Sequence, residues 1–199
     1  MPEVLVKQGI EAGRVNPLFI EKLVQEAMTK KFGKLGVESS YVGRMANLDF
    51  YFNRSALVEK KIDKKGAEDY ISEVLTTSVP QLFCVYKAED LIYGKTSKDS
   101  ISEFVQNSYH AKNSGDLVII LKPNYVWDRN NVGAEHGSPY SYDRHVPLIL
   151  YGANWIKPGN FGTACSPADI APTLSAILGI DAPNSSDGKI LKEVIRFSK

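Results

Sequence analysis

The run of apolar residues at 117–121 (LVIIL) constrains the fold of this chain more than any other feature. Within the segment DLVIILK at 116–122, the apolar side chains occupy consecutive positions. A strand with one face in water alternates apolar and polar residues, so consecutive apolar residues predict a strand that is covered on both faces. The run is far too short to cross a membrane, which takes roughly 20 apolar residues.

Further strands and helices are predicted before this strand. The segments 48–53 and 81–87 are rich in aromatic and apolar residues, which favours strands. Apolar residues at helical spacing predict one helix over 65–76, which Asp63 could cap, and another over 98–109. The resulting order β-α-β-α-β predicts a small open sheet with helices packed against it.

An earlier helix has the clearest ends in the sequence. Asn16 can accept hydrogen bonds from the free N–H groups of the first turn, and Pro17 suits the first helical position because it lacks an N–H. Gly33 is the expected stop. Apolar residues recur between them at helical spacing: Phe19, Ile20, Leu23, Val24 and Ala27.

The last third of the chain predicts one strand and two helices. The strand is expected at 145–152 (HVPLILYG). A helix over 167–178 has Ser166 as its N-cap and Gly179 as its stop. The segment 187–195 predicts a final surface helix.

Composition excludes several classes of protein. The 199 residues include 24 Lys and Arg against 23 Asp and Glu, a net charge of +1. We therefore expect neither a nucleic-acid-binding surface nor electrostatic docking on a membrane. The two cysteines, Cys84 and Cys165, supply neither a CxxC zinc site nor a disulfide framework. No apolar segment follows a basic start at the N-terminus, so no signal peptide is predicted in this chain.

A histidine loop is the one candidate for chemistry. His136 lies between Gly133 and Gly137 in the segment GAEHGSPYSYDRHVPLILYG, where tight backbone turns could aim the imidazole at a cleft. Asp143 and His145 stand two positions apart and could join His136 in a metal cluster. Alternatively, Asp143 holds the loop by a hydrogen bond, and His136 is a structural or surface residue.

Other polar residues predict no catalytic role. His110 ends a helix and is expected at the surface. Ser138 and Thr173 have no visible base partner and are expected to be structural. The motifs GxSxG and HExxH, a phosphate-binding Walker loop and GxGxxG are all absent from the sequence.

Several ordered blocks resemble a known family. HGSPYSYDRHVPLILYG, SPADIAPTLSAILGI and DGKIL resemble the C-terminal part of alkaline phosphatase superfamily enzymes. The nearest types are the bacterial phosphate-irrepressible alkaline phosphatases and their relatives, the type I phosphodiesterases and nucleotide pyrophosphatases. NSGDLVIILKPNYVWD and EAGRVNPLFIEKLVQEAMTKKFG are similar to the same family, so the resemblance covers nearly the whole chain.

The resemblance implies an α/β fold, the C-terminal part of an alkaline phosphatase-like structure with a mixed sheet and flanking helices. Residues 1–199 would form one α/β unit of a larger enzyme. It could divide into a β-α-β-α-β lobe at 1–123 and a lobe at 124–199 that holds the metal-ligand loop, a strand and a helix.

The resemblance also implies a metal site that this chain completes only in part. The family uses two zinc ions and a Thr or Ser nucleophile to hydrolyse phosphate esters. By its place in the motif, His136 resembles one metal ligand, and it is the only ligand expected here. Gly137 would let the loop approach the ion, and Asp143 would shape the loop. No Asp-His-Gly segment occurs in the sequence, so no catalytic residue is expected in this chain.

These implications set expectations for function. The parent protein would be a zinc-dependent phosphatase, periplasmic or secreted, and monoesters are preferred because the HGSPYSYD block resembles the phosphate-irrepressible enzymes. A phosphodiesterase or nucleotide pyrophosphatase is the first alternative, and a sulfatase or phosphonate hydrolase is a more distant one. A non-catalytic binding or assembly module is the competing class. Without its N-terminal half, the isolated chain should be inactive and should self-associate, for example as a homodimer.

Overall fold

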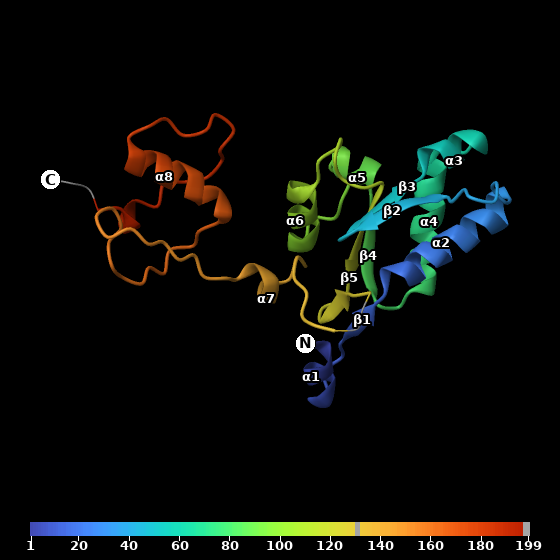
Figure 1. Ribbon diagram of the computed structural model, residues 1–199, viewed down its shortest axis with the longest axis horizontal. Coiled ribbons are helices and arrows are strands. Elements are labelled where there is room, and N and C mark those ends of the chain that lie inside the picture. The colour runs from blue at the N-terminus through green and yellow to red at the C-terminus, as the bar shows by residue number, and fades with distance from the viewer. Residues whose placement is uncertain (130–131, 197–199) are drawn as a thin grey trace. The chain divides into compact units, whose positions relative to one another are not determined.

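The computed structural model describes residues 1–129 and 132–196 (Figure 1). The chain forms two compact units, Met1–His145 and Val146–Lys199. This boundary lies later in the chain than the division after residue 123 suggested by the sequence, and it places the histidine loop in the first unit.

A four-stranded antiparallel sheet forms the centre of the first unit. Its strand order is β2 (Val42–Ala46), β3 (Asp49–Phe52), β5 (Leu117–Leu121) and β4 (Leu82–Lys87). All five residues of β5 are buried, which confirms the prediction from the consecutive apolar run. The mixed α/β class with flanking helices is likewise confirmed.

The consecutive apolar residues of β5 are explained by two separate cores, one on each face of the sheet. On one face, Leu117 and Ile119 pack in a core that includes residues of α2 (Pro17–Phe32), α3 (Arg54–Glu59) and α4 (Lys64–Ser78). On the other face, Val118 and Ile120 pack with residues of α5 (Ala88–Ile92) and α6 (Ser100–Ser108). Successive side chains of a strand point to opposite faces, so a strand between two cores must be apolar throughout.

The predicted helix ends are confirmed. The Asn16 side chain accepts a hydrogen bond from the Leu18 amide at 2.9 Å, and α2 ends at Gly33, whose φ is +88°. Asp63 caps α4 by accepting from the Gly66 amide at 2.9 Å. These side chains satisfy N–H groups that the first turn of a helix leaves free.

Short elements that the sequence did not predict surround the histidine loop. Strands β1 (Gly13–Val15) and β6 (Tyr125–Trp127) form a parallel pair, which α1 (Pro2–Lys7) precedes in the chain. The short helix α7 (Ser141–Arg144) follows the loop. The strands have only three residues each, which is too short to give a periodic signal.

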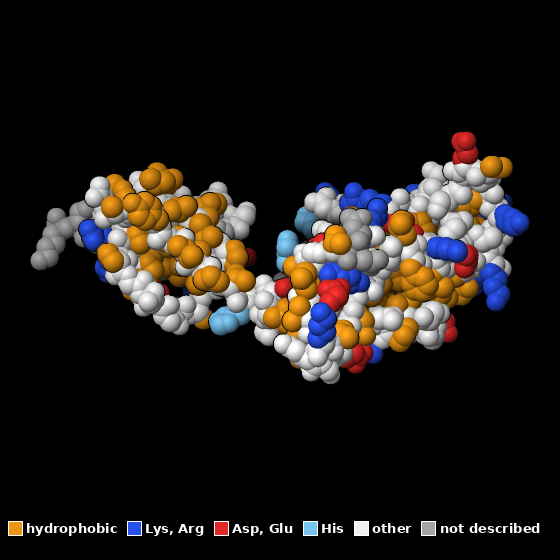
Figure 2. Space-filling view, turned by 60° about the horizontal axis from the view of Figure 1, so that its bottom comes forward, with side chains coloured by type: hydrophobic (Ala, Val, Ile, Leu, Met, Phe, Trp, Pro, Cys, Tyr) orange, Lys and Arg blue, Asp and Glu red, His pale blue; other side chains and the backbone are white. Residues whose placement is uncertain are grey.

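The predicted strand at 145–152 is wrong. These residues have no regular secondary structure, and the Ile149 side chain is 84% exposed. A strand needs the backbone of a neighbour, and the described part of the second unit offers this segment no strand to pair with. Figure 2 shows hydrophobic side chains over much of the visible face of this unit.

The predicted helix over 167–178 is confirmed. It begins with the 3₁₀ turn η1 (Pro167–Asp169) and continues as α8 (Ile170–Leu178). Ser166 and Asp169 form a capping box, and Gly179 ends the helix with a φ of +66°.

The predicted final helix over 187–195 is largely wrong, because only the 3₁₀ turn η2 (Lys192–Val194) forms there. The Lys189 amide donates to Asp169, and the Leu191 amide donates to the Thr173 hydroxyl. These amides are therefore used in contacts with η1 and α8 and cannot form a helical ladder. In the described parts of the chain, no helix is both long and apolar enough to span a membrane.

Candidate metal-ligand loop

The candidate site lies on the segment that leaves β6 and leads to α7. His136 is exposed on this segment. Gly133 and Gly137 flank it with φ values of +84° and +97°, in the left-handed region that favours glycine. A Cβ atom added at either glycine would meet nothing within 4 Å, so the turn conformation is what these glycines supply.

Arg14 holds the first end of the loop. This residue is the middle one of β1, and its guanidinium donates to the Gly133 carbonyl at 2.8 Å and to the Val132 carbonyl at 3.4 Å. The same guanidinium pairs with Glu3 on α1 and with Asp128, which directly follows β6. The nearly buried Arg14 guanidinium therefore fixes the start of the loop beside the end of β6.

Two tyrosines hold the other end of the loop against the sheet. The Tyr140 hydroxyl donates to the Leu121 carbonyl at 2.7 Å, and the Tyr142 hydroxyl accepts from the Asn124 amide at 3.0 Å. Burial raises the pKa of the Tyr140 phenol to about 12, so the hydroxyl stays protonated at neutral pH. The two rings stack with centroids 5.7 Å apart.

Asp143 makes the hydrogen bond that the alternative interpretation of this residue expected. Its Oδ2 accepts from the Ser138 amide at 2.9 Å, closing the turn that follows His136 and Gly137. Arg144, the next residue, lies over the Phe104 ring at 3.3 Å from its centroid. This contact attaches α7 to α6.

A cavity of about 870 Å³ lies beside the loop. It is lined by His136 and by residues of β5 and β6, among them Ile120 and Trp127. Two hydrogen-bonding groups in its wall, the Trp127 Nε1 and the Ser138 hydroxyl, are buried without a partner in the described structure. These two polar groups belong to residues that line the same cavity as His136.

The structure does not bring the predicted donors together as a complete metal site. Across residues 1–129 and 132–196, no three or more His, Cys, Asp or Glu side chains are placed to hold one ion. His145 is exposed at the end of α7, and Asp143 is engaged with the loop backbone. A closed zinc site needs four ligands and a catalytic one three, and the described residues supply neither set.

His110 lies at the surface, as predicted, and Thr173 makes a structural contact. His110 is exposed, and its Nδ1 accepts from the Lys112 amide at 3.3 Å. Thr173 is buried and holds the Leu191 amide.

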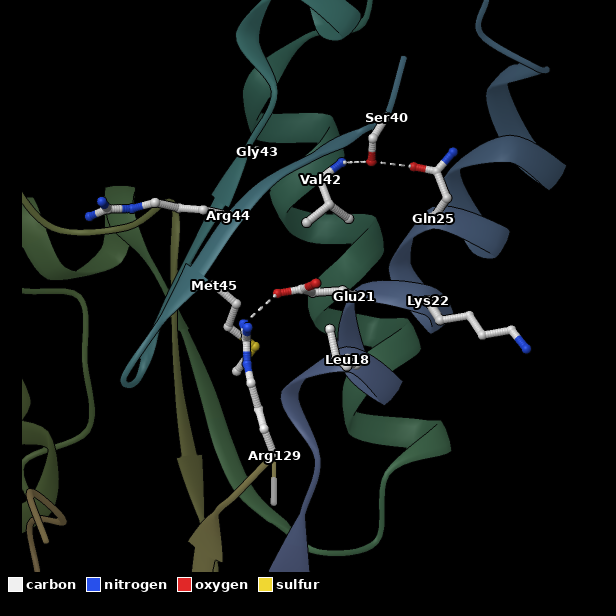
Figure 3. A pocket seen from close by; sticks show the side chains of 10 residues that line it. All are labelled: Leu18, Glu21, Lys22, Gln25, Ser40, Val42, Gly43, Arg44, Met45 and Arg129. Carbon is white, nitrogen blue, oxygen red and sulfur yellow. Dashed lines mark hydrogen bonds and ion pairs between the residues drawn. The ribbon is translucent and has the colours of Figure 1, made fainter. Parts of the chain in front are cut away.

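A second hollow of about 450 Å³ lies between α2 and β2 (Figure 3). Two pairs of polar groups lie in it: Glu21 with Arg129 at 3.5 Å, and Gln25 with the Ser40 hydroxyl at 2.9 Å. The Arg44 side chain points away from it and stacks on Tyr51. The Glu21 carboxylate and the Ser40 hydroxyl are therefore both engaged in these pairs.

Comparisons with known proteins identify the family. No family model matches the chain. It is 33% identical to alkaline phosphatase PafA from Elizabethkingia meningoseptica over 89% of its own length and 32% of that protein. A crystal structure of wild-type alkaline phosphatase PafA superposes with a TM-score of 0.81 at 27% identity, over 97% of this chain and 35% of that one. The chain belongs to the alkaline phosphatase superfamily.

Within the alkaline phosphatase superfamily, the chain corresponds to the C-terminal portion of its relatives. It spans about a third of the length of PafA and of a second curated relative. One of them is named a calcium-transporting ATPase, from Myroides odoratus, and is 27% identical over 98% of this chain and 34% of that protein.

Proposed function

We propose that this chain is the C-terminal region of a zinc-dependent phosphoric ester hydrolase that prefers monoesters, and that His136 supplies one of its metal ligands. Membership of the alkaline phosphatase superfamily supports the hydrolase. The observation that carries the ligand role is an exposed imidazole on a loop that is fixed at both ends and borders a cavity. The parent enzyme would be periplasmic or secreted.

In such an enzyme, two bound zinc ions would polarise a phosphate oxygen and activate water. This chain's part is to hold one imidazole nitrogen at a fixed position. Gly133 and Gly137 give the backbone the turns that present the ring, and Asp143 keeps the second turn closed. The remaining ligands and the nucleophile would come from outside this chain, so the chain alone should not hydrolyse phosphate esters.

A chimaeric enzyme tests this proposal. The chain replaces the matching C-terminal portion of PafA from E. meningoseptica, and p-nitrophenyl phosphate hydrolysis and zinc content are measured. We expect activity in the chimaera, and a loss on the order of 100-fold or more with less bound zinc in its His136→Ala variant, because one ion loses a ligand. His110→Ala is the matched control, since it removes an exposed imidazole elsewhere in the first unit.

Two results would contradict the proposal. One is a folded chimaera in which His136→Ala leaves zinc content and rate unchanged. The other is tight, stoichiometric zinc binding by the 199-residue chain alone in calorimetry, which would favour a local cluster with Asp143 and His145. We expect the chain alone to hold zinc weakly.

The substrate class is tested with the full-length parent protein, because the chimaera takes its nucleophile and its remaining metal ligands from PafA. A monoesterase should cleave p-nitrophenyl phosphate faster than bis-p-nitrophenyl phosphate, and the reverse order would identify a phosphodiesterase. A non-catalytic module is the second candidate function, and the observation that favours it is that the described residues hold no three converging metal ligands. An active chimaera that depends on His136 excludes it.

A further inference from the structure

We propose that Arg14 is a positioning residue that fixes the His136 loop to the β1–β6 strand pair. The inference deepens the proposed function and rests on it only for the role of zinc. It concerns how the imidazole is held in place before any metal binds.

All five N–H groups of the Arg14 guanidinium are used. Nε and Nη2 donate to the two carboxylate oxygens of Glu3 at 2.6 and 3.1 Å, which is a bidentate pair. Nη1 donates to Asp128 and to the Val132 carbonyl, and Nη2 also donates to the Gly133 carbonyl. One side chain therefore joins α1, the end of β6 and the start of the histidine loop.

The position of Arg14 makes this junction rigid. Its side chain is only 8% exposed, and the Asp128 side chain is 5% exposed. The Asp128 amide also donates to the Val15 carbonyl at 3.0 Å, continuing the β1–β6 pairing beyond Trp127. A planar guanidinium presents its donors in a fixed fork, whereas a lysine ammonium is a flexible point charge. Lysine could not reproduce this set of contacts.

The contacts with the loop carry the functional consequence. Gly133 lies three positions before His136, and the loop from Val132 to Gly137 is exposed. Within the described structure, the loop is held at its start by Arg14 and after Gly137 by the bond between the Ser138 amide and Asp143. Removal of Arg14 would leave one end of the loop free. A metal ligand has to be held to within about 0.5 Å, so a loose loop would weaken the site.

The contacts of Arg14 with Glu3, Asp128 and the loop should persist across the neutral pH range. The Arg14 guanidinium lowers the pKa of Glu3 to about 2, so this carboxylate stays ionised at all pH values well above that. The charges that face Arg14 in the described contacts are the carboxylates of Glu3 and Asp128.

The first test measures the order of the loop in the 199-residue chain, without metal. Backbone ¹⁵N relaxation is recorded for wild type, Arg14→Lys and Arg14→Gln. We expect the order parameters of residues 132–137 to fall from about 0.85 to below about 0.6 in both variants. Residues of β5 should keep their values. Arg54→Gln is the matched control, because it removes a guanidinium–carboxylate pair far along the chain from the loop.

A second variant separates positioning from a general structural role. Glu3→Gln removes the charged link to α1 but leaves the contacts of Arg14 with Val132 and Gly133 in place. We expect it to disturb the loop less than Arg14→Lys does. The proposal is overturned if the loop stays ordered in both Arg14 variants, or if Glu3→Gln loosens the loop equally.

The last test uses the chimaera and depends on zinc. Arg14→Lys should raise the zinc concentration for half-maximal activity on the order of 10-fold, and added zinc should restore the rate. A loss of activity that zinc does not restore would contradict a positioning role. If His136→Ala leaves the zinc content unchanged while the Arg14 variants still loosen the loop, the proposed function fails. The positioning role of Arg14 is then still supported.

Discussion

Substitution of Asp116 is a sharp test of how the central sheet is held. This carboxylate directly precedes β5 and is 3% exposed. It accepts from the Phe52 amide at 2.9 Å and from Arg54 at 2.5 Å, and Lys64 lies 3.2 Å away. Asp116→Ala therefore leaves the buried Phe52 amide without this acceptor. It also removes the negative charge that faces Arg54 and Lys64.

The expected cost follows from which partners can return to water. A buried N–H without a partner costs about 1–3 kcal/mol. Breaking a fully buried ion pair costs about 3–5 kcal/mol, but Arg54 is 58% exposed and can be hydrated, so its share is much smaller. Lys64 keeps its pair with Glu68 at 2.8 Å. We therefore expect Asp116→Ala to lower the free energy of opening the sheet by about 2–3 kcal/mol.

Amide hydrogen exchange of β5 measures this loss within the first unit. A change of 2–3 kcal/mol corresponds to exchange that is about 30- to 150-fold faster. Asp116→Asn keeps an oxygen that can accept from the Phe52 amide, so it should lower this free energy by only about 1 kcal/mol. Arg54→Gln should lower it by about 1 kcal/mol at most. The reasoning is refuted if Asp116→Ala accelerates exchange less than fivefold, or if Asp116→Asn costs as much as Asp116→Ala.

Three further predictions concern reactivity, association and pH. Burial raises the pKa of the Cys84 thiol to about 11. At pH 8 a thiol reagent should therefore label the exposed Cys165 much faster than Cys84. Equal labelling rates for the two cysteines in mass spectrometry would be inconsistent with the burial of Cys84. The isolated chain should self-associate through its exposed apolar segment at 145–152. Ile149→Lys should then shift the mass measured by light scattering toward that of the monomer. A clean wild-type monomer at high concentration would count against this. Folding lowers the pKa of Glu3 to about 2, so the pairing of Glu3 with Arg14 stabilises the fold fully above the unfolded pKa near 4. This stabilisation is lost as the pH falls toward about 2. The order parameters of the loop should therefore stay constant from pH 5 to 9, and a fall near pH 6 would contradict the assignment.

The sequence predicted the elements whose cause is local or periodic. The run at 117–121 predicted a doubly covered strand because each face of β5 needs its own apolar residues. Asn16, Asp63 and Ser166 marked helix starts because a cap acts within three residues of its own position. The segment 145–152 misled because an apolar run shows that burial is favoured but does not say which backbone would pair with it.

The candidate site divides in the same way. His136 and its two glycines could be found in the sequence, because the turn residues stand beside the imidazole. The hydrogen bond of Asp143 is also local, five residues from its partner. Arg14 could not be found, because its contacts with Asp128 and Gly133 span 114 and 119 residues. Such contacts emerge only once β1 and β6 are paired.

The identity of the metal ligand is the central claim, and anomalous X-ray scattering at the zinc edge tests it most directly. In crystals of the chimaeric phosphatase, we expect a zinc peak about 2.0–2.1 Å from one ring nitrogen of His136. Fully occupied zinc sites with this imidazole bonded to none of them would contradict the account.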